Sequence, residues 1–231
     1  TPDVIGLYSR LNDFRVLRAS HVAMEISSHA LDQKRVEGLL LDVGVWTNLT
    51  RDHLDYHKTE ENYFKAKEAL FTQHIKREGF ALINGDAQNL NKVKSATGIK
   101  TYRFGRQGDF SFSILKESLE GVKFHFTTPF GSSDIWLSTP GVHNVYNAAG
   151  ALASALCLGY SLNEVKQSLE GFRGAPGRLE LVHKEPHVFV DYAHTPDALA
   201  SSLRALKNLV GDHQKIIAVF GFGGDRDPGK R

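Results

Sequence analysis

Short apolar runs alternate with a helical pattern along the first hundred residues of the chain. The segments HVAMEIS (21–27), LLLDVGVWTNL (39–49) and FALING (80–85) are apolar and bounded by polar residues, which predicts three buried strands. Before the third segment, Thr59 is followed by two glutamates, which predicts a helix with Thr59 as its N-cap. Strands that alternate with helices are typical of a parallel, doubly wound sheet.

The pattern changes after residue 100. The segments KTYRFG, FSFSIL, GVKFHFTT and SSDIWLS, all within residues 100–139, are short and often alternate apolar with polar positions, as antiparallel strands do. Two helices are predicted next, at 143–160 and 161–169, and the first of them is rich in alanine. The glycine-rich run GFRGAPGR (171–178) predicts a linker.

The last part of the chain predicts a second α/β domain. The strand HVFVDYA, a helix at 196–209 and the strand KIIAVFGFG form the pattern of a βαβ unit that begins near Leu179. We therefore expect an α/β fold with one domain at residues 1–178 and the start of another at residues 179–231.

Composition and charge narrow the class of protein. The chain has 231 residues, of which 41% are hydrophobic and 23% are charged, which is ordinary for a globular protein. A net charge of +2 gives no electrostatic reason to expect nucleic acid or an anionic membrane as a partner. The single cysteine, Cys157, cannot form an internal disulfide, and no apolar run approaches the roughly 20 residues that span a bilayer. We expect a cytoplasmic protein.

A lysine occupies a position of the predicted helix where an apolar residue is expected. One face of this helix, at spacings i, i+4, i+7, i+8 and i+11, carries Tyr63, Lys67, Leu70, Phe71 and His74. Lys67 can be a snorkelling lysine, whose stem packs while its amine reaches water. Alternatively it is a buried amine with a lowered pKa, which is reactive at neutral pH and could capture CO₂ as a carbamate.

Two residues near the predicted strand ends could complete a metal site around this lysine. Glu25 lies near the end of the first predicted strand, and His53 lies in the loop after the second. Ligands of open parallel sheets bind beyond the carboxyl ends of the strands. A carboxylate, an imidazole and a carbamate would suit Mg²⁺ or Mn²⁺. The spacing alone is equally compatible with ordinary strand-end and loop residues.

Two further motifs lie in the C-terminal part. The run GDRDPGKR (224–231) has the spacing of a phosphate-binding P-loop, but Arg231 replaces the required Ser or Thr and Pro228 removes an amide, so we reject that interpretation. The run DYAHTPDAL can be a plain strand-to-helix turn with Thr195 as N-cap. It can also direct Asp191 and His194 towards a ligand.

Read together, these segments resemble the Mur ligase family of amide-forming cell-wall enzymes, and in particular its tripeptide-synthetase branch. The resemblance covers nearly the whole chain and is carried by seven motifs in order: MEISSHALDQKRVEG, TNLTRDHLDYH, YFKAKEALF, GVHNVYNAAGALA, APGRLE, VDYAHTPDAL and FGFGGDRDPGKR. It implies a Mur-ligase central domain, with a mostly parallel sheet, flanking helices and a small antiparallel sheet. The start of a Rossmann-like domain would follow.

The resemblance also implies a reaction. ATP would phosphorylate the D-Glu carboxylate of UDP-MurNAc-L-Ala-D-Glu, and the amine of a diamino acid, meso-diaminopimelate or L-lysine, would attack the acyl phosphate. The expected cofactors are ATP and Mg²⁺, and the expected role is in peptidoglycan biosynthesis, and so in cell shape and division. We expect a monomer without nucleic-acid or membrane partners.

Residue by residue, the resemblance assigns three groups of site residues. Glu25 and His53 match Mg²⁺ ligands, and Lys67 matches a carbamylated lysine that helps to place a second Mg²⁺. The residues that match contacts to the sugar-nucleotide dipeptide are Thr1, Ser27, Gln33 and Arg35, while Arg226 matches a contact to the incoming amino acid. The nucleotide side is matched by Asn144, Arg178, Asp191 and His194.

Several family features are absent from the 231 residues. They include the N-terminal uridine-binding domain, the G-T-[NK]-G-K-[ST] phosphate loop and the D-N-P-R region, so we expect the 231-residue chain to be inactive by itself. Rival hypotheses are folylpolyglutamate synthase, the tripeptide-extending Mur ligase and a non-catalytic nucleotide-sugar binding module. A metal-dependent hydrolase that uses Glu25 and His53 is a further rival.

Overall fold

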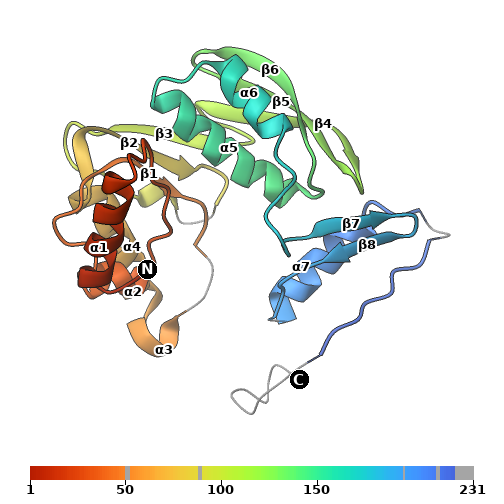
Figure 1. The fold of residues 1–231 in the computed structure, drawn as a ribbon, viewed down its shortest axis with the longest axis horizontal. Coiled ribbons are helices and arrows are strands. Elements are labelled where there is room, and N and C mark those ends of the chain that lie inside the picture. The colour runs from red at the N-terminus through yellow and green to blue at the C-terminus, as the bar shows by residue number, and fades with distance from the viewer. Residues whose placement is uncertain (50–52, 88–89, 195, 212–213, 222–231) are drawn as a thin grey trace. The chain divides into compact units, whose positions relative to one another are not determined.

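The computed structural model describes residues 1–49, 53–87, 90–194, 196–211 and 214–221 (Figure 1). The chain divides into two compact units, of which the first comprises residues 1–109 and 153–159 and the second comprises residues 110–152 and 160–231. No helix of the described residues is long and apolar enough to cross a membrane.

The first unit combines helices with parallel strands. Its elements are α1 (Val4–Val16), α2 (Ser28–Asp32), β1 (Leu41–Trp46), α3 (Leu54–His57), α4 (Glu60–Gln73), β2 (Ile75–Asn84), η1 (Leu90–Lys92) and β3 (Lys100–Gly105). Strand β2 pairs in parallel with both β1 and β3. Helix α4 lies between β1 and β2 in the sequence, as a crossover between parallel strands requires. Figure 1 shows α1, α2 and α4 gathered beside these strands.

Helix α4 packs on the strands through its apolar face. The Phe71 and Trp46 rings stack with centroids 5.6 Å apart, and the Phe64 ring lies 5.2 Å from the Trp46 ring. These three side chains belong to one buried cluster with residues of β2, including Ile83. The predicted helix and the orientation of its apolar face are confirmed, since Tyr63, Phe71 and His74 are buried.

Helix α4 begins at the predicted N-cap, because the Thr59 side chain accepts a hydrogen bond from the Asn62 backbone N–H at 3.1 Å. We expect Thr59→Ala to lower the free energy of unfolding by about 1 kcal/mol, since an N–H of the first turn loses its acceptor. Thr72→Ala is the matched control, because Thr72 lies exposed inside the same helix and alanine is favoured there. Urea unfolding followed by circular dichroism measures both; equal losses would contradict the capping role.

The strand predicted at residues 21–27 is wrong. This segment forms no helix or strand, and Val22 is 47% exposed. Met24 and Ile26 pack against a cluster made by Leu7 of α1 and Leu31 of α2. The apolar side chains of this segment therefore contact helices instead of a sheet, and a short apolar run by itself could not distinguish the two.

The direction of β3 also differs from the prediction. KTYRFG was grouped with the antiparallel strands, but β3 pairs in parallel with β2, with Phe80 opposite Lys100 and Asn84 opposite Phe104. Alternation of apolar and polar residues in a sequence indicates a strand with one covered face and carries no information on the direction of the neighbouring strand.

The second unit contains an antiparallel sheet covered by helices. Its elements are β4 (Phe110–Ser118), β5 (Gly121–Thr128), β6 (Gly131–Leu137), α5 (Val142–Cys157), α6 (Leu162–Glu170), β7 (Glu180–Lys184), β8 (His187–Val190) and α7 (Pro196–Lys207). Helix α5 belongs to this unit as far as residue 152. Strand β5 pairs antiparallel with β4 and β6, as predicted. The inner face of this sheet carries the buried side chains Phe110, Phe112, Phe124, Phe126 and Ile135. The Tyr146 ring of α5 lies 4.9 Å from the Phe112 ring.

The βαβ unit predicted after Leu179 is not formed by the described residues. Strand β8 pairs antiparallel with β7, and helix α7 follows. Residues 214–221 contain no strand, and Ile217 and Val219 are 86% and 94% exposed. The short HVFV strand thus pairs with the preceding ELVHK segment, for which no strand was predicted. The α/β fold class itself is confirmed.

Candidate functional site

Three predicted substrate residues meet at the N-terminus of α2. The Thr1 hydroxyl donates to the Glu25 carbonyl oxygen at 2.9 Å and accepts from the Ser27 backbone N–H at 3.1 Å. Ser27 is the N-cap of α2, and its side chain accepts from the Ala30 N–H at 3.2 Å. From the C-terminal side of α2, the Arg35 guanidinium donates through Nη1 to the Thr1 carbonyl oxygen at 3.1 Å. Residues 1, 27 and 35 are therefore held together by direct hydrogen bonds.

The fourth predicted substrate residue joins this group through Arg35. The Arg35 Nε donates to Gln33 Oε1 at 2.9 Å, and Nη2 of the same guanidinium donates to the same oxygen. Two N–H groups of one guanidinium that donate to a single oxygen hold that oxygen on the Nε–Nη2 edge and so restrict the orientation of the guanidinium. The group of Thr1, Ser27, Gln33 and Arg35, which we call the Thr1–Arg35 cluster, offers hydroxyl, amide and cationic groups to a polar, anionic ligand.

The face of α4 that carries Lys67 meets His53 through a tyrosine. Lys67 is half-buried, and its Nζ lies 5.3 Å from the centroid of the Tyr63 ring. The His53 ring approaches the same tyrosine edge-on, at 5.9 Å between centroids. His53 precedes α3 with φ 56° and ψ 25°, a left-handed conformation that directs the chain from the loop into that helix. His53 and Lys67 therefore both contact the same buried ring, that of Tyr63.

The third predicted metal ligand is less constrained. Glu25 is exposed, and the hydrogen bond described above involves its backbone oxygen. Because residues 21–27 form no strand, Glu25 is not fixed at the end of a sheet. Within the described ranges, no group of three or more His, Cys, Asp and Glu side chains could hold a metal ion. Mg²⁺ commonly binds through one or two protein ligands, with waters and substrate phosphates, and one carboxylate with one imidazole fits that mode.

Three of the four predicted nucleotide-side residues line one cavity of the second unit. This cavity has a volume of about 610 Å³, and its lining includes Asn144, Arg178 and Asp191. Asn144 is anchored by donating through Nδ2 to the Pro140 carbonyl oxygen at 2.8 Å. The Arg178 guanidinium carbon lies 5.3 Å from the Tyr192 ring centroid. Small residues of α5, including Ala148, form part of the wall and leave the space open.

Asp191 braces the turn beside this cavity. Its Oδ2 accepts from the Leu179 N–H at 2.7 Å, while its Oδ1 accepts from the Ala193 N–H at 2.8 Å and from the Ser202 hydroxyl at 3.2 Å. The turn after β8 is therefore tied to the segment before β7 and to α7. His194 is not among the residues that line the cavity, and its Nδ1 lies 3.0 Å from the Tyr192 carbonyl oxygen.

Some predicted residues lie outside the described part of the chain. These are Arg226, the whole GDRDPGKR run and the predicted N-cap Thr195.

A set of aromatic residues around the site was not predicted from the sequence. The His29 ring contacts the His53 ring at 4.8 Å and the Tyr56 ring at 4.2 Å between centroids. The buried His57 places its Nε2 3.0 Å from the Ser28 hydroxyl, and burial together with the neighbouring His29 lowers the pKa of His57. The available signal was the density of His and Tyr in SSHALD and DHLDYH, which together contain four such residues.

Comparisons with known proteins identify both parts of the chain. A family model described as the Mur ligase middle domain matches residues 1–155, and one described as the glutamate ligase domain of Mur ligases matches residues 177–231. The UDP-N-acetylmuramoyl-L-alanyl-D-glutamate–2,6-diaminopimelate ligase of Geobacter sulfurreducens is 39% identical over 240 residues, which cover 100% of this chain and 47% of that protein.

Solved structures agree with these matches. A structure of UDP-N-acetylmuramoyl-L-alanyl-D-glutamate–2,6-diaminopimelate ligase gives a TM-score of 0.81 at 35% identity, over 100% of this chain and 48% of that one. The UDP-N-acetylmuramoylalanyl-D-glutamyl-2,6-diaminopimelate–D-alanyl-D-alanyl ligase from Acinetobacter baumannii gives 0.64 at 29% identity, over 72% and 37%. The chain spans about half the length of the curated relatives it matches.

Proposed function

The chain belongs to the Mur ligase family, and on this premise we propose that the full-length protein is an ATP-dependent ligase of peptidoglycan precursor synthesis. It joins a diamino acid to UDP-MurNAc-L-Ala-D-Glu. The D-Glu carboxylate attacks the γ-phosphate of ATP and releases ADP; the amine then attacks the resulting acyl phosphate and releases phosphate. The diamino acid is 2,6-diaminopimelate, which the names of similar ligases specify.

The observation that carries this proposal is the proximity of two groups of residues in the first unit. The Thr1–Arg35 cluster is hydrogen-bonded around α2, and α2 packs against α4, which carries Lys67. His29 of α2 contacts His53 directly. A substrate bound by the cluster would thus have its reacting end near the His53–Tyr63–Lys67 group, as phosphoryl transfer to that end requires.

In the proposed site, the cluster binds the anionic substrate through the Arg35 guanidinium and nearby polar groups. Glu25, His53 and a carbamylated Lys67 would hold Mg²⁺, which when bound neutralises phosphate charge during the transfer. Lys67 would serve as an anionic oxygen ligand in this form. The buried Tyr63 ring beside its Nζ limits the positions that the side chain can take.

The nucleotide would be bound by residues of the second unit. Asn144 and Arg178 would contact the adenine and ribose part, and Asp191 and His194 would belong to the ATP-facing turn. The cavity with its amide, guanidinium and carboxylate groups supports this assignment. Arg226 would hold the carboxylate of the incoming amino acid. Further parts of the proposal are domains at residues 1–178 and 179–231, a cytoplasmic location and a monomeric state.

The test is a product assay with the full-length protein. It is incubated with ATP, Mg²⁺, UDP-MurNAc-L-Ala-D-Glu and a panel of amino acids that includes 2,6-diaminopimelate and L-lysine, and the product masses are measured. We expect one new mass, dependent on ATP, with 2,6-diaminopimelate. No product with any amino acid would indicate a sister ligase that extends another carboxylate, or, where UDP-MurNAc-L-Ala-D-Glu still binds, a nucleotide-sugar binding module.

A further inference from the structure

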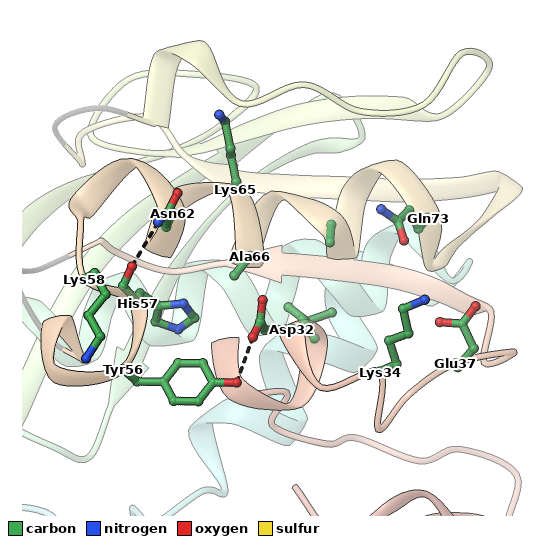
Figure 2. Close-up of a pocket in the computed structure, with 12 residues that line it drawn as sticks. Asp32, Lys34, Glu37, Tyr56, His57, Lys58, Asn62, Lys65, Ala66 and Gln73 are labelled. Atoms are coloured by element: carbon green, nitrogen blue, oxygen red, sulfur yellow. Dashed lines mark hydrogen bonds between the residues drawn. The ribbon is translucent and has the colours of Figure 1, made fainter.

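A chain of hydrogen bonds continues from Arg35 beyond the Thr1–Arg35 cluster. Gln33, whose Oε1 accepts from Arg35, donates through Nε2 to the Tyr56 hydroxyl oxygen at 3.1 Å. The Tyr56 hydroxyl in turn donates to Asp32 Oδ2 at 2.7 Å. Figure 2 shows this last bond between α3 and α2, on the wall of a pocket of about 560 Å³. Asp32 and Tyr56 have no role in the function proposed above.

The two ends of this chain determine the direction of every bond in it. A carboxylate accepts hydrogen bonds and donates none, so the Tyr56 hydroxyl uses its one proton on Asp32. Its oxygen then accepts from Gln33, which turns the amide NH₂ towards Tyr56 and the amide oxygen towards Arg35. The Arg35 guanidinium can only donate, so it requires that oxygen. The acceptor-only and donor-only ends therefore select one of the two orientations of the Gln33 amide.

The tyrosine is itself held in place by its neighbours. Its ring lies 4.2 Å from the His29 ring and 4.8 Å from the His57 ring, measured between centroids. Tyr56 belongs to the short helix α3, and its bonds to Asp32 and Gln33 span 24 and 23 residues. The hydroxyl therefore reaches the end of α2 from a separate part of the chain, on a ring whose rotation is restricted by packing.

We propose that Tyr56 and Asp32 are positioning residues for the sugar-nucleotide dipeptide, acting through Gln33 and Arg35. They fix the Gln33 amide, which fixes the plane of the Arg35 guanidinium. The bonds to Gln33 and Thr1 occupy three of the five guanidinium N–H groups, and the others are directed by this arrangement to an anionic group of the substrate. This inference rests on the proposed ligase function.

The test is Tyr56→Phe in the full-length protein, assayed for steady-state kinetics with each substrate in turn. Phenylalanine keeps the ring contacts to His29 and removes only the hydroxyl. We expect KM for UDP-MurNAc-L-Ala-D-Glu to rise about 3- to 10-fold, the loss of roughly one hydrogen bond. The value of kcat and the KM values for ATP and the amino acid should stay within about twofold, because the change concerns binding of one substrate.

Asp32→Asn tests the direction of the chain, since an amide can donate as well as accept. Asparagine would let the Tyr56 hydroxyl turn towards Gln33 and thus permit the flipped Gln33 amide, so the same KM should rise. The double variant with Tyr56→Phe should be no worse than Tyr56→Phe alone, because both changes interrupt one chain. Effects that multiply would show that Asp32 acts independently and would overturn the direction argument.

Tyr8→Phe is the matched control. The Tyr8 hydroxyl also makes one hydrogen bond at the surface of the first unit, to the Glu37 carbonyl oxygen at 2.8 Å, and we expect all KM values to be unchanged. Thermal unfolding of each variant reports any loss of structure. An unchanged dipeptide KM in Tyr56→Phe, with an active wild type, would overturn this inference alone; an inactive wild type would instead overturn the proposed function.

Discussion

Replacement of Lys67 by alanine in the full-length protein should reduce kcat by about 10²- to 10³-fold. This loss is of the size found when one preorganised charged group that stabilises a transition state is removed. Tyr63 and His53 remain in place in this variant, and the side chain lost is the one that contacts the Tyr63 ring. If Lys67 acts as a carbamate, a short carboxylic acid added to the assay should partly restore turnover. The measurement is ADP release with saturating substrates.

Lys65→Ala is the matched control for this experiment. Lys65 lies on the same helix, two residues earlier, with an exposed side chain that pairs with Glu61 at 3.6 Å. An exposed ion pair of this kind contributes little to stability, and Lys65 is not a proposed site residue. The value of kcat should therefore change less than twofold in Lys65→Ala. If Lys67→Ala retained wild-type turnover, Lys67 would be a snorkelling lysine and the proposed role would be wrong. Equal losses in both variants would point to a damaged helix.

Phe126→Ala should lower the free energy of opening of the second unit by about 3–5 kcal/mol. Phe126 is fully buried on the inner face of β5, with its ring 6.3 Å from the Phe124 ring and 6.4 Å from the Phe110 ring. Truncation of such a side chain loses its transfer free energy and leaves a cavity. Hydrogen exchange of β5 peptides in the full-length protein measures this opening.

Phe130→Ala is the control, because Phe130 has the same side chain but is 58% exposed in the turn between β5 and β6. Phe130→Ala should lower the same free energy of opening by less than about 1 kcal/mol, since most of the Phe130 side-chain area is in contact with water before and after folding. A Phe126 variant that exchanges as slowly as the Phe130 variant would contradict a packed inner face. Neither Phe126 nor Phe130 is a proposed site residue or lines the nucleotide-side cavity, so turnover of both variants should match that of the wild type at temperatures where the second unit is folded.

Much of the candidate site could be inferred from local pattern. The Thr59 cap, the two following glutamates and the spacing of apolar residues defined α4 and placed Lys67 on its packed face. Ser27, Gln33 and Arg35 were assigned by the resemblance to the family, and no helix was predicted between them; they lie within nine residues, and α2 with its cap brings them near each other. The fold class also followed from local pattern. The spacing of apolar residues distinguishes a helix from a strand, and the order of the two along the chain indicates an α/β fold.

Other features depended on partners that are remote in the sequence. The apolar side chains in residues 21–27 pack against helices α1 and α2, β3 runs parallel to β2, and β8 pairs with β7. The apolar and polar residues of a segment are spaced in the same way whichever partner it contacts, so the sequence pattern does not indicate the partner.

The sequence by itself therefore determined the fold class, the helix that presents Lys67 and the kinds of polar groups at the site. Only the tertiary structure decided how those groups are connected. The bond from Arg35 to Thr1 spans 34 residues, and Tyr56 reaches Asp32 from another helix. A hydrogen bond requires its donor and acceptor to approach within about 3 Å at a suitable angle. Sequence spacing sets this geometry within one turn of helix, and tertiary packing sets it between separate segments.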